Sequence, residues 1–175
     1  ATVINTSVEV AGSSTLRAAG ADFNASTNPV NGGLIYVGLS SAIALEGGSV
    51  GAIEIWEKSS AYLSGVTLSG TNIWGDDFAL DINASFVGLE DSTTVNENVF
   101  VRSNGVLEVE GSTINGDLIV FANSTVSIED GSVISATRAS GNPLTCPTGW
   151  DEGIRLNLGS IMTVEDAASS ISGYL

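Results

Sequence analysis

Two neighbouring stretches decide the fold: 95-VNENVFVRSNGVLEVEGST-113 is followed directly by 114-INGDLIVFANSTVSIEDGS-132. Each begins with a β-branched residue and continues through two short runs in which apolar and polar residues alternate. Each ends in acidic and small residues that include Gly and Ser. Alternation with a period of two is typical of strands with one buried side, so each stretch predicts short strands joined by tight turns.

The repeat extends through most of the chain. A third copy, 31-NGGLIYVGLSSAIALEGGSV-50, matches 115–133 with one extra residue. We anchored the copies on the last apolar residue before the acidic position, at spacings of 19 to 23 residues: Leu45, Leu68, Leu89, Val109 and Ile128. Further copies are anchored at Val10 and Val164. The sequence therefore predicts about seven turns of one repeated unit.

A period near 20 residues, with short alternating strands, predicts an all-β parallel β-helix, or β-solenoid. We expect one domain over residues 1–175, with about seven coils of 19–23 residues and three strands per coil. An antiparallel sandwich also has short strands and frequent turns, but it gives no reason for E-(G/D)-(G/S)-(S/T) to recur after equivalent strands. Leucine-rich repeats need a frame that this sequence lacks.

Two stretches interrupt the repeat, at residues 18–31 and 138–155, and we expect them to be inserted loops. Loops at one corner of a solenoid either bind ligands or cap an open coil end. The segments 1–10 and 165–175 are predicted to be terminal strands or caps. Cys146 has no second cysteine to pair with inside the chain, so the fold does not depend on a disulfide.

Short motifs in the repeat resemble those of known proteins. They are N-G-G-L-I-Y-V at 31–37, N-G-D-L-I-V at 115–120 and E-G-S-T-I at 110–114. Through 31–137 the chain resembles parallel β-helix and β-solenoid proteins in general, which include adhesin stalks, phage tail fibres and polymer-forming bactofilins. The resemblance implies a fold and a structural role, and it carries no functional residue with it.

Composition excludes several functions. The 20 acidic residues face only 5 basic ones, for a net charge of -15, so no basic stripe is available for nucleic acid. The absence of histidine removes His-dependent catalysis and His-containing zinc sites, and we expect no enzyme. No apolar run reaches the roughly 18 residues of a membrane span. Few lysines, many small polar residues and a start at Ala1 without Met are expected of an extracellular or cell-surface chain.

Alternation also predicts which apolar side chains face outward, namely Trp56, Phe100, Ile119 and Phe121. An apolar stripe on an acidic rod is typical of an association surface. We therefore expect a self-assembling structural protein whose partner is a second copy of itself, as in a filament, fibre, adhesin or surface layer.

The acidic position of the repeat predicts a column of carboxylates from Glu46 to Glu165, with Ser69 interrupting it. Either these side chains splay into solvent, or calcium lies between them. The candidate calcium ligands are Glu90, Asp91, Glu110, Glu129 and Asp130. No other cofactor is expected.

The alternative function is carbohydrate binding or polysaccharide cleavage, as in a tail-spike or lyase. Asp76, Asp77 and Asp81 would act as acids, and Trp56, Trp74 or Trp150 as platforms for a surface glycan. Separately, four N-x-S/T sequons mark candidate glycosylation sites: Asn5, Asn24, Asn83 and Asn123.

Overall fold

The computed structural model describes residues 2–4, 6–23, 33–70, 78–136 and 153–172. All helices and strands assigned in these residues are β-strands, with no helix among them, and this confirms the all-β prediction. In this part of the chain there is accordingly no helix long and apolar enough to cross a membrane. The strands pair in parallel and form one 13-stranded and one 7-stranded sheet.

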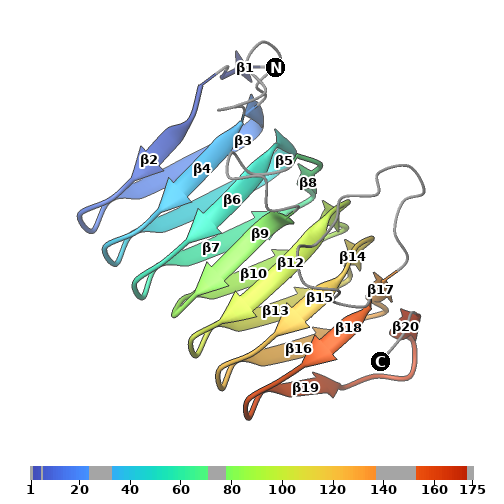
Figure 1. Ribbon diagram of the computed structural model, residues 1–175. Coiled ribbons are helices and arrows are strands. Elements are labelled where there is room, and N and C mark those ends of the chain that lie inside the picture. The colour runs from blue at the N-terminus through green and yellow to red at the C-terminus, as the bar shows by residue number, and fades with distance from the viewer. Residues whose placement is uncertain (1, 5, 24–32, 71–77, 137–152, 173–175) are drawn as a thin grey trace.

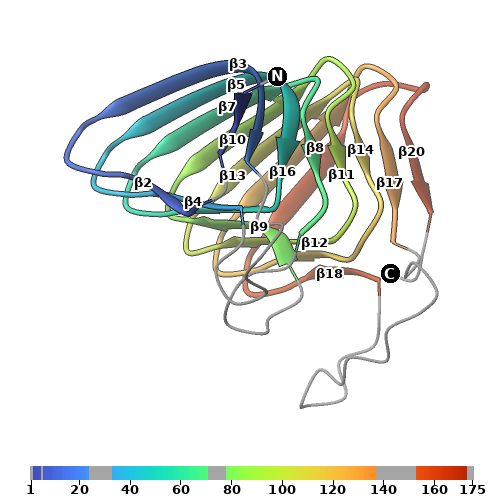
Figure 2. The same cartoon turned by 90° about the horizontal axis from the view of Figure 1, so that it is seen from above.

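The strands line three faces of the molecule, and the chain visits the faces in the same order on every turn (Figures 1 and 2). The first face is the seven-stranded sheet: β2 (Val8–Val10), β4 (Leu34–Val37), β6 (Ala52–Ile55), β9 (Phe78–Asn83), β12 (Asn98–Arg102), β15 (Leu118–Val120) and β18 (Ile154–Leu156). The second face consists of β3 (Thr15–Phe23), β5 (Ala42–Val50), β7 (Ser60–Ser64), β10 (Phe86–Glu90), β13 (Val106–Glu110), β16 (Thr125–Glu129) and β19 (Ile161–Val164). The third face consists of β1 (Thr2–Val3), β8 (Thr67–Leu68), β11 (Thr94–Val95), β14 (Thr113–Ile114), β17 (Val133–Ser135) and β20 (Ser170–Ser172), together with the last residues of β3 and β5.

Each strand between the first and last turns pairs with the equivalent strands one turn before and one turn after it. For example, β10 pairs with both β7 and β13, and β12 with both β9 and β15. The sheets curl around a common core, as Figure 2 shows. These curled parallel sheets are compatible with the predicted solenoid, and the first face contributes one strand to each of seven turns.

Equivalent apolar side chains form columns in the core because successive turns are in register. On the second face one column, at most 2% exposed, contains Leu45, Leu63, Leu89, Val109 and Ile128. Parallel strands lie about 4.8 Å apart, so each of these side chains packs on the next and the core is continuous along the stack.

Two of the predicted anchor residues were assigned to the wrong column. Leu68 pairs with Val50 and Val95 on the third face, and Leu63 takes the predicted place. Val10 pairs with Val37 on the first face. Leu63 and Leu68 are both followed by a serine, Ser64 and Ser69, so sequence alone did not distinguish them.

The spacing of the turns is less regular than the sequence predicted. Along the second face, from Leu45 to Val164, the steps are 18, 26, 20, 19 and 36 residues. The chain between β8 and β9 is longer than the connections β5–β6, β11–β12 and β14–β15, and the choice of Leu68 as an anchor concealed this.

The predicted loops and terminal segments overlap several strands. Residues 18–23 belong to β3, and Ile154 and Arg155 belong to β18, while 24–31 and 138–152 lie outside the described residues. The segment 1–10 contains β1 and β2, and the segment 165–175 contains β20.

Turns between the faces need left-handed backbone. Gly48 in β5 has φ +89°, and a Cβ there would lie 2.1 Å from the carbonyl oxygen of Ala21 on the neighbouring strand. Only glycine allows both this conformation and this close approach. Gly48 is therefore required at the corner of β5, next to a second left-handed glycine, Gly47, with φ +65°.

Buried hydroxyl groups link successive turns at both of the strand corners on the second face. At the first corner, a backbone N–H of one turn donates to the serine Oγ of the next, in the pairs Ser14–Ser41 (3.1 Å), Ser41–Ser59 (3.2 Å), Ser59–Ser85 (3.2 Å) and Gly105–Ser124 (3.1 Å). At the second corner the pairs are Val66–Thr93 (3.2 Å), Ser112–Ser132 (3.2 Å) and Ser132–Ser169 (3.1 Å). We call these sets the hydroxyl ladders. They explain why Ser or Thr follows the acidic position of the repeat, and no buried side-chain polar atom of the described residues lacks a partner.

Ser132 offers a direct test of the ladders. Its buried Oγ accepts from the N–H of Ser112, and the hydroxyl lies within hydrogen-bond distance of the carbonyls of Glu129, at 2.5 Å, and Val109, at 2.9 Å. Ser132→Ala leaves the buried Ser112 N–H without its acceptor, and we expect the free energy of unfolding to fall by about 1–3 kcal/mol in denaturant titrations. Ser132→Thr is the control, because Thr93 makes the equivalent bonds two turns earlier in the same ladder. Equal stability of the Ala variant and the wild type would contradict this role.

Candidate functional site

The predicted column of carboxylates exists on the outer side of the second face. Glu90, Glu110 and Glu129 end three consecutive strands, β10, β13 and β16, and Glu110 pairs directly with Glu129. The residue that interrupts the column is Ser64, which pairs with both Glu46 and Glu90, and Ser69 was the wrong assignment. Ser64 directly follows Leu63, which occupies the place in the column that the sequence assigned to Leu68.

The carboxylates of this column interact with one another. A side-chain hydrogen bond to Asp130 raises the pKa of Glu110, and repulsion from Asp130, slight desolvation and the charges of Glu90 and Glu129 raise it further. Glu129 accepts a hydrogen bond from the Ser127 hydroxyl at 2.8 Å. Stacking therefore imposes a cost here, because it places like charges on adjacent strands.

Asp91, another candidate calcium ligand, is hydrogen-bonded to a hydroxyl group. The carboxylate of Asp91 accepts from the Ser64 hydroxyl at 2.9 Å. Within the described ranges, no three carboxylates converge as the ligands of a metal ion would. Calcium binding by these residues stays a prediction.

The repulsion between these carboxylates is expected to lower the free energy of unfolding, which can be measured. The raised pKa means that folding disfavours the ionised form of Glu110, so its penalty is present above that pKa and disappears below the ordinary carboxyl value. We expect Glu110→Gln to be more stable than the wild type near pH 7 and equal to it near pH 3, in urea unfolding at both values. The control is Glu46→Gln, since Glu46 faces Ser64 in register rather than a carboxylate. A gain that is independent of pH would contradict the electrostatic explanation.

Asp81, one of the predicted acids, is engaged in an ion pair. It is 3% exposed and lies on β9, and Arg102 on the next strand donates Nε to its Oδ1 at 2.9 Å and a second N–H to its Oδ2. A carboxylate held in this bidentate way is ionised and oriented by the guanidinium. Asp76, Asp77, Trp74 and Trp150 lie outside the described residues, so Asp81 is the one predicted acid whose surroundings the structure describes.

The predicted apolar stripe is present on the first face in a shorter form. Phe100 and Ile119 pair directly, and Phe121 follows two residues after Ile119 on the same side. All three are half-buried, and the Phe100 ring packs edge-on against Phe78 with centroids 5.6 Å apart. Asp81 and Arg102 lie between this group and Trp56, so Trp56 does not continue the stripe.

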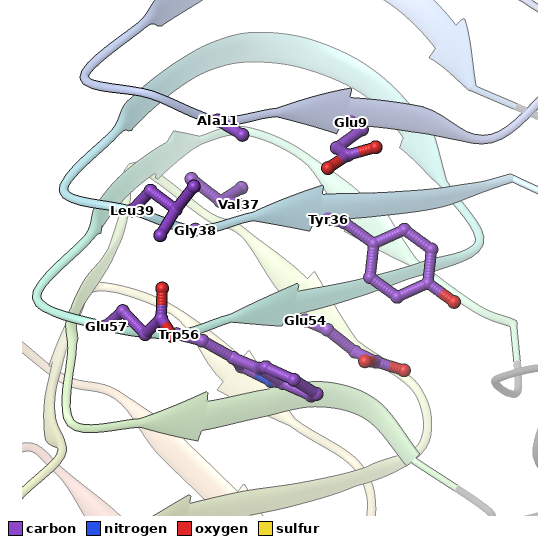
Figure 3. Close-up of a pocket in the computed structure, with 9 residues that line it drawn as sticks. All are labelled: Glu9, Ala11, Tyr36, Val37, Gly38, Leu39, Glu54, Trp56 and Glu57. Carbon is purple, nitrogen blue, oxygen red and sulfur yellow. The ribbon is translucent and has the colours of Figure 1, made fainter.

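Trp56 instead lines a pocket at the N-terminal end of the first face (Figure 3). It is 43% exposed and follows β6 at the corner with the second face. The other lining residues are Glu9, Ala11, Tyr36, Val37, Gly38, Leu39, Glu54 and Glu57. Sequence analysis selected Trp56 but missed this pocket, because its walls come from three separate turns.

Two candidate glycosylation sites lie among the described residues. Asn123 is exposed at a turn, with φ 61°, while Asn83 ends β9 and is half-buried. Asn5, Asn24 and Cys146 lie outside the described residues.

The turn formed by β18, β19 and β20 is open on its far side. Each of these strands is the last in its sheet path among the described residues. Leu156 and Val164 occupy inward-facing columns, in register with the fully buried Val120 and Ile128, yet they are 41% and 44% exposed. Among the described residues, this end therefore exposes core side chains, and no further strand pairs with its outer edge.

Comparison with known proteins adds no functional assignment, since no family model, curated protein or solved structure matches this chain.

Proposed function

We propose that the chain is a parallel β-solenoid and that its function is structural: copies associate end to end into an extracellular filament, fibre or surface layer. The single observation that carries the proposal is the open turn at β18–β20, where core residues such as Leu156 and Val164 are exposed. An open strand edge with an apolar interior is a template for another strand layer.

The N-terminal turn of a second copy has the shape to cover this turn. On that turn, within the part of the chain that the structure describes, β2 pairs only with β4, and residues 15–19 of β3 pair only with β5, so both leave one edge open to a further strand. A second copy would place its β2 on β18 and its β3 on β19, in the same parallel register that stacks the turns within the chain. The buried columns would then continue from one copy into the next.

Charge complementarity favours this arrangement. One outward column of the first face begins at Glu9 and ends at Arg155, with Tyr36, Glu54, Asp81, Phe100 and Ile119 between them. Stacking copies in register would set Arg155 beside Glu9 of the next copy, about one strand spacing away. This contact opposes the repulsion between chains that each carry a net charge of -15.

A charge-reversal series tests the interface. We expect Arg155→Glu and Glu9→Arg each to weaken self-association about tenfold or more, and the double variant to regain it, because the pair is restored with its signs exchanged. Sedimentation velocity and electron microscopy at 0.15 M salt measure the outcome. Glu108→Arg, an exposed site on β13 between the two ends, is the control. A monomer in every variant, including the wild type at high concentration, would refute the proposal.

The N-terminal strand β1 conflicts with end-to-end stacking. It pairs with Ala21 and Asp22 of β3, and the Ile4 N–H donates to the Asp22 carbonyl at 2.8 Å. In the stacked arrangement β20 of the preceding copy would need the same edge of β3. Only one of the two strands can pair there, so β1 would act as a removable cap.

Deleting residues 1–4 tests the cap. We expect the shortened chain to associate more strongly than the full chain, since β1 contributes only two paired residues and both are exposed. Concentration-dependent sedimentation gives the comparison. Weaker association after the deletion would show instead that this segment contributes to the contact between copies.

A further inference from the structure

The pocket around Trp56 is a depression in the outer surface of the first face. It encloses about 370 Å³ and draws its walls from the first three turns of the molecule (Figure 3). This volume lies at the lower end of the range for small-molecule sites. Its position on the outer side of the first face separates it from the open β18–β20 turn.

Small residues create the space. Ala11, Gly38 and Trp56 occupy the same position after β2, β4 and β6, and the ladder continues through them, with Gly38 N–H donating to Val10 and Trp56 N–H donating to Val37. A Cβ added at Gly38 would meet no atom within 4 Å, so the room beside the indole is empty of protein. The hollow therefore results from two small side chains next to one large one.

One wall of the pocket consists of a tyrosine between two glutamates on three adjacent strands. Glu9, Tyr36 and Glu54 pair in direct register on β2, β4 and β6, which places the phenol ring between two carboxylates. Glu54 is 3% exposed, so its position is fixed by packing. This wall lies beside the indole of Trp56, as Figure 3 shows.

The opposite wall comes from two turns at the corner with the second face. Leu39 and Glu57 both adopt left-handed backbone, with φ 54° and 57°. Glu57 adds a third carboxylate, and none of the lining residues is basic. Lys58 follows Glu57 in the chain but does not line the pocket.

We propose that this pocket binds an organic cation, with its alkylammonium group over the ring of Trp56 and near Tyr36. Aromatic faces attract ammonium groups through the quadrupole of the ring, and the carboxylates of Glu9 and Glu57 add Coulomb attraction at the same pocket. The same charges repel anionic ligands, including acidic sugars. A neutral sugar would gain from stacking on the indole but not from the charge, and this difference makes the two ligand classes distinguishable.

Choline and its neutral isostere, 3,3-dimethylbutan-1-ol, test the charge requirement directly. We expect isothermal titration calorimetry of the full chain to detect choline binding, with the isostere at least tenfold weaker and the choline affinity falling as salt rises. Equal binding of the two compounds would overturn the proposal. So would binding of neutral oligosaccharides in preference to choline, which would favour carbohydrate recognition.

Two variants locate the site, and each leaves the strands intact. Gly38→Leu fills the hollow without a clash, since its Cβ position is open and its φ is not left-handed. Trp56→Ala removes the main ring, and we expect about a tenfold loss of choline affinity. The control is Asn157→Leu, which follows β18 at the position equivalent to Gly38. Unchanged choline binding in both pocket variants would overturn the assignment, and neither result bears on self-association, which sedimentation reports separately.

Discussion

The structure depends on the parallel register that stacks each turn on the one before it. Backbone hydrogen bonds hold the strands about 4.8 Å apart on three faces, but they would form equally well in a slipped register. The hydroxyl ladders at the corners remove that freedom, because each buried serine or threonine must meet a particular backbone N–H of the preceding turn. A slip of one residue would bury unpaired polar groups and turn the apolar columns outward. Register, core and surface are thus fixed by one set of contacts.

Stacking brings equivalent side chains of successive turns into contact. For apolar residues these contacts are stabilising, since Leu63, Leu89 and Val109 form a continuous core. For carboxylates they are destabilising, and the pKa of Glu110 is raised because acids lie on consecutive strands. Where the repeat is broken, the surface acquires specific chemistry: Asp81 meets Arg102, and Gly38 leaves room beside Trp56. Residues that depart from the repeat therefore give the surface its specific contacts and its pocket.

The two proposals share Glu9 but rest on different physical interactions. End-to-end association rests on exposed core residues and free strand edges, which any open parallel stack presents, and on complementary charges at Glu9 and Arg155. The pocket rests on local shape and charge within the first three turns. Glu9 belongs to both, as the outermost residue of the pocket wall and of the N-terminal edge. A ligand in the pocket would therefore lie close to the contact between copies.

By itself the sequence determined the strand content, the inward and outward alternation, the repeat of about 20 residues and the recurring acidic position, because these follow from local periodicity and from like residues recurring at equal steps. Only the tertiary structure decided the register. The sequence spacing made Leu68 the equivalent of Leu89, whereas the strands pair Leu63 with Leu89, since the longer connection between β8 and β9 shifts the count. Nor did the sequence predict the bidentate partner of Asp81 or the hollow beside Trp56. Both arise between residues 18 or more positions apart, and contacts at that distance depend on how the turns stack rather than on any local pattern.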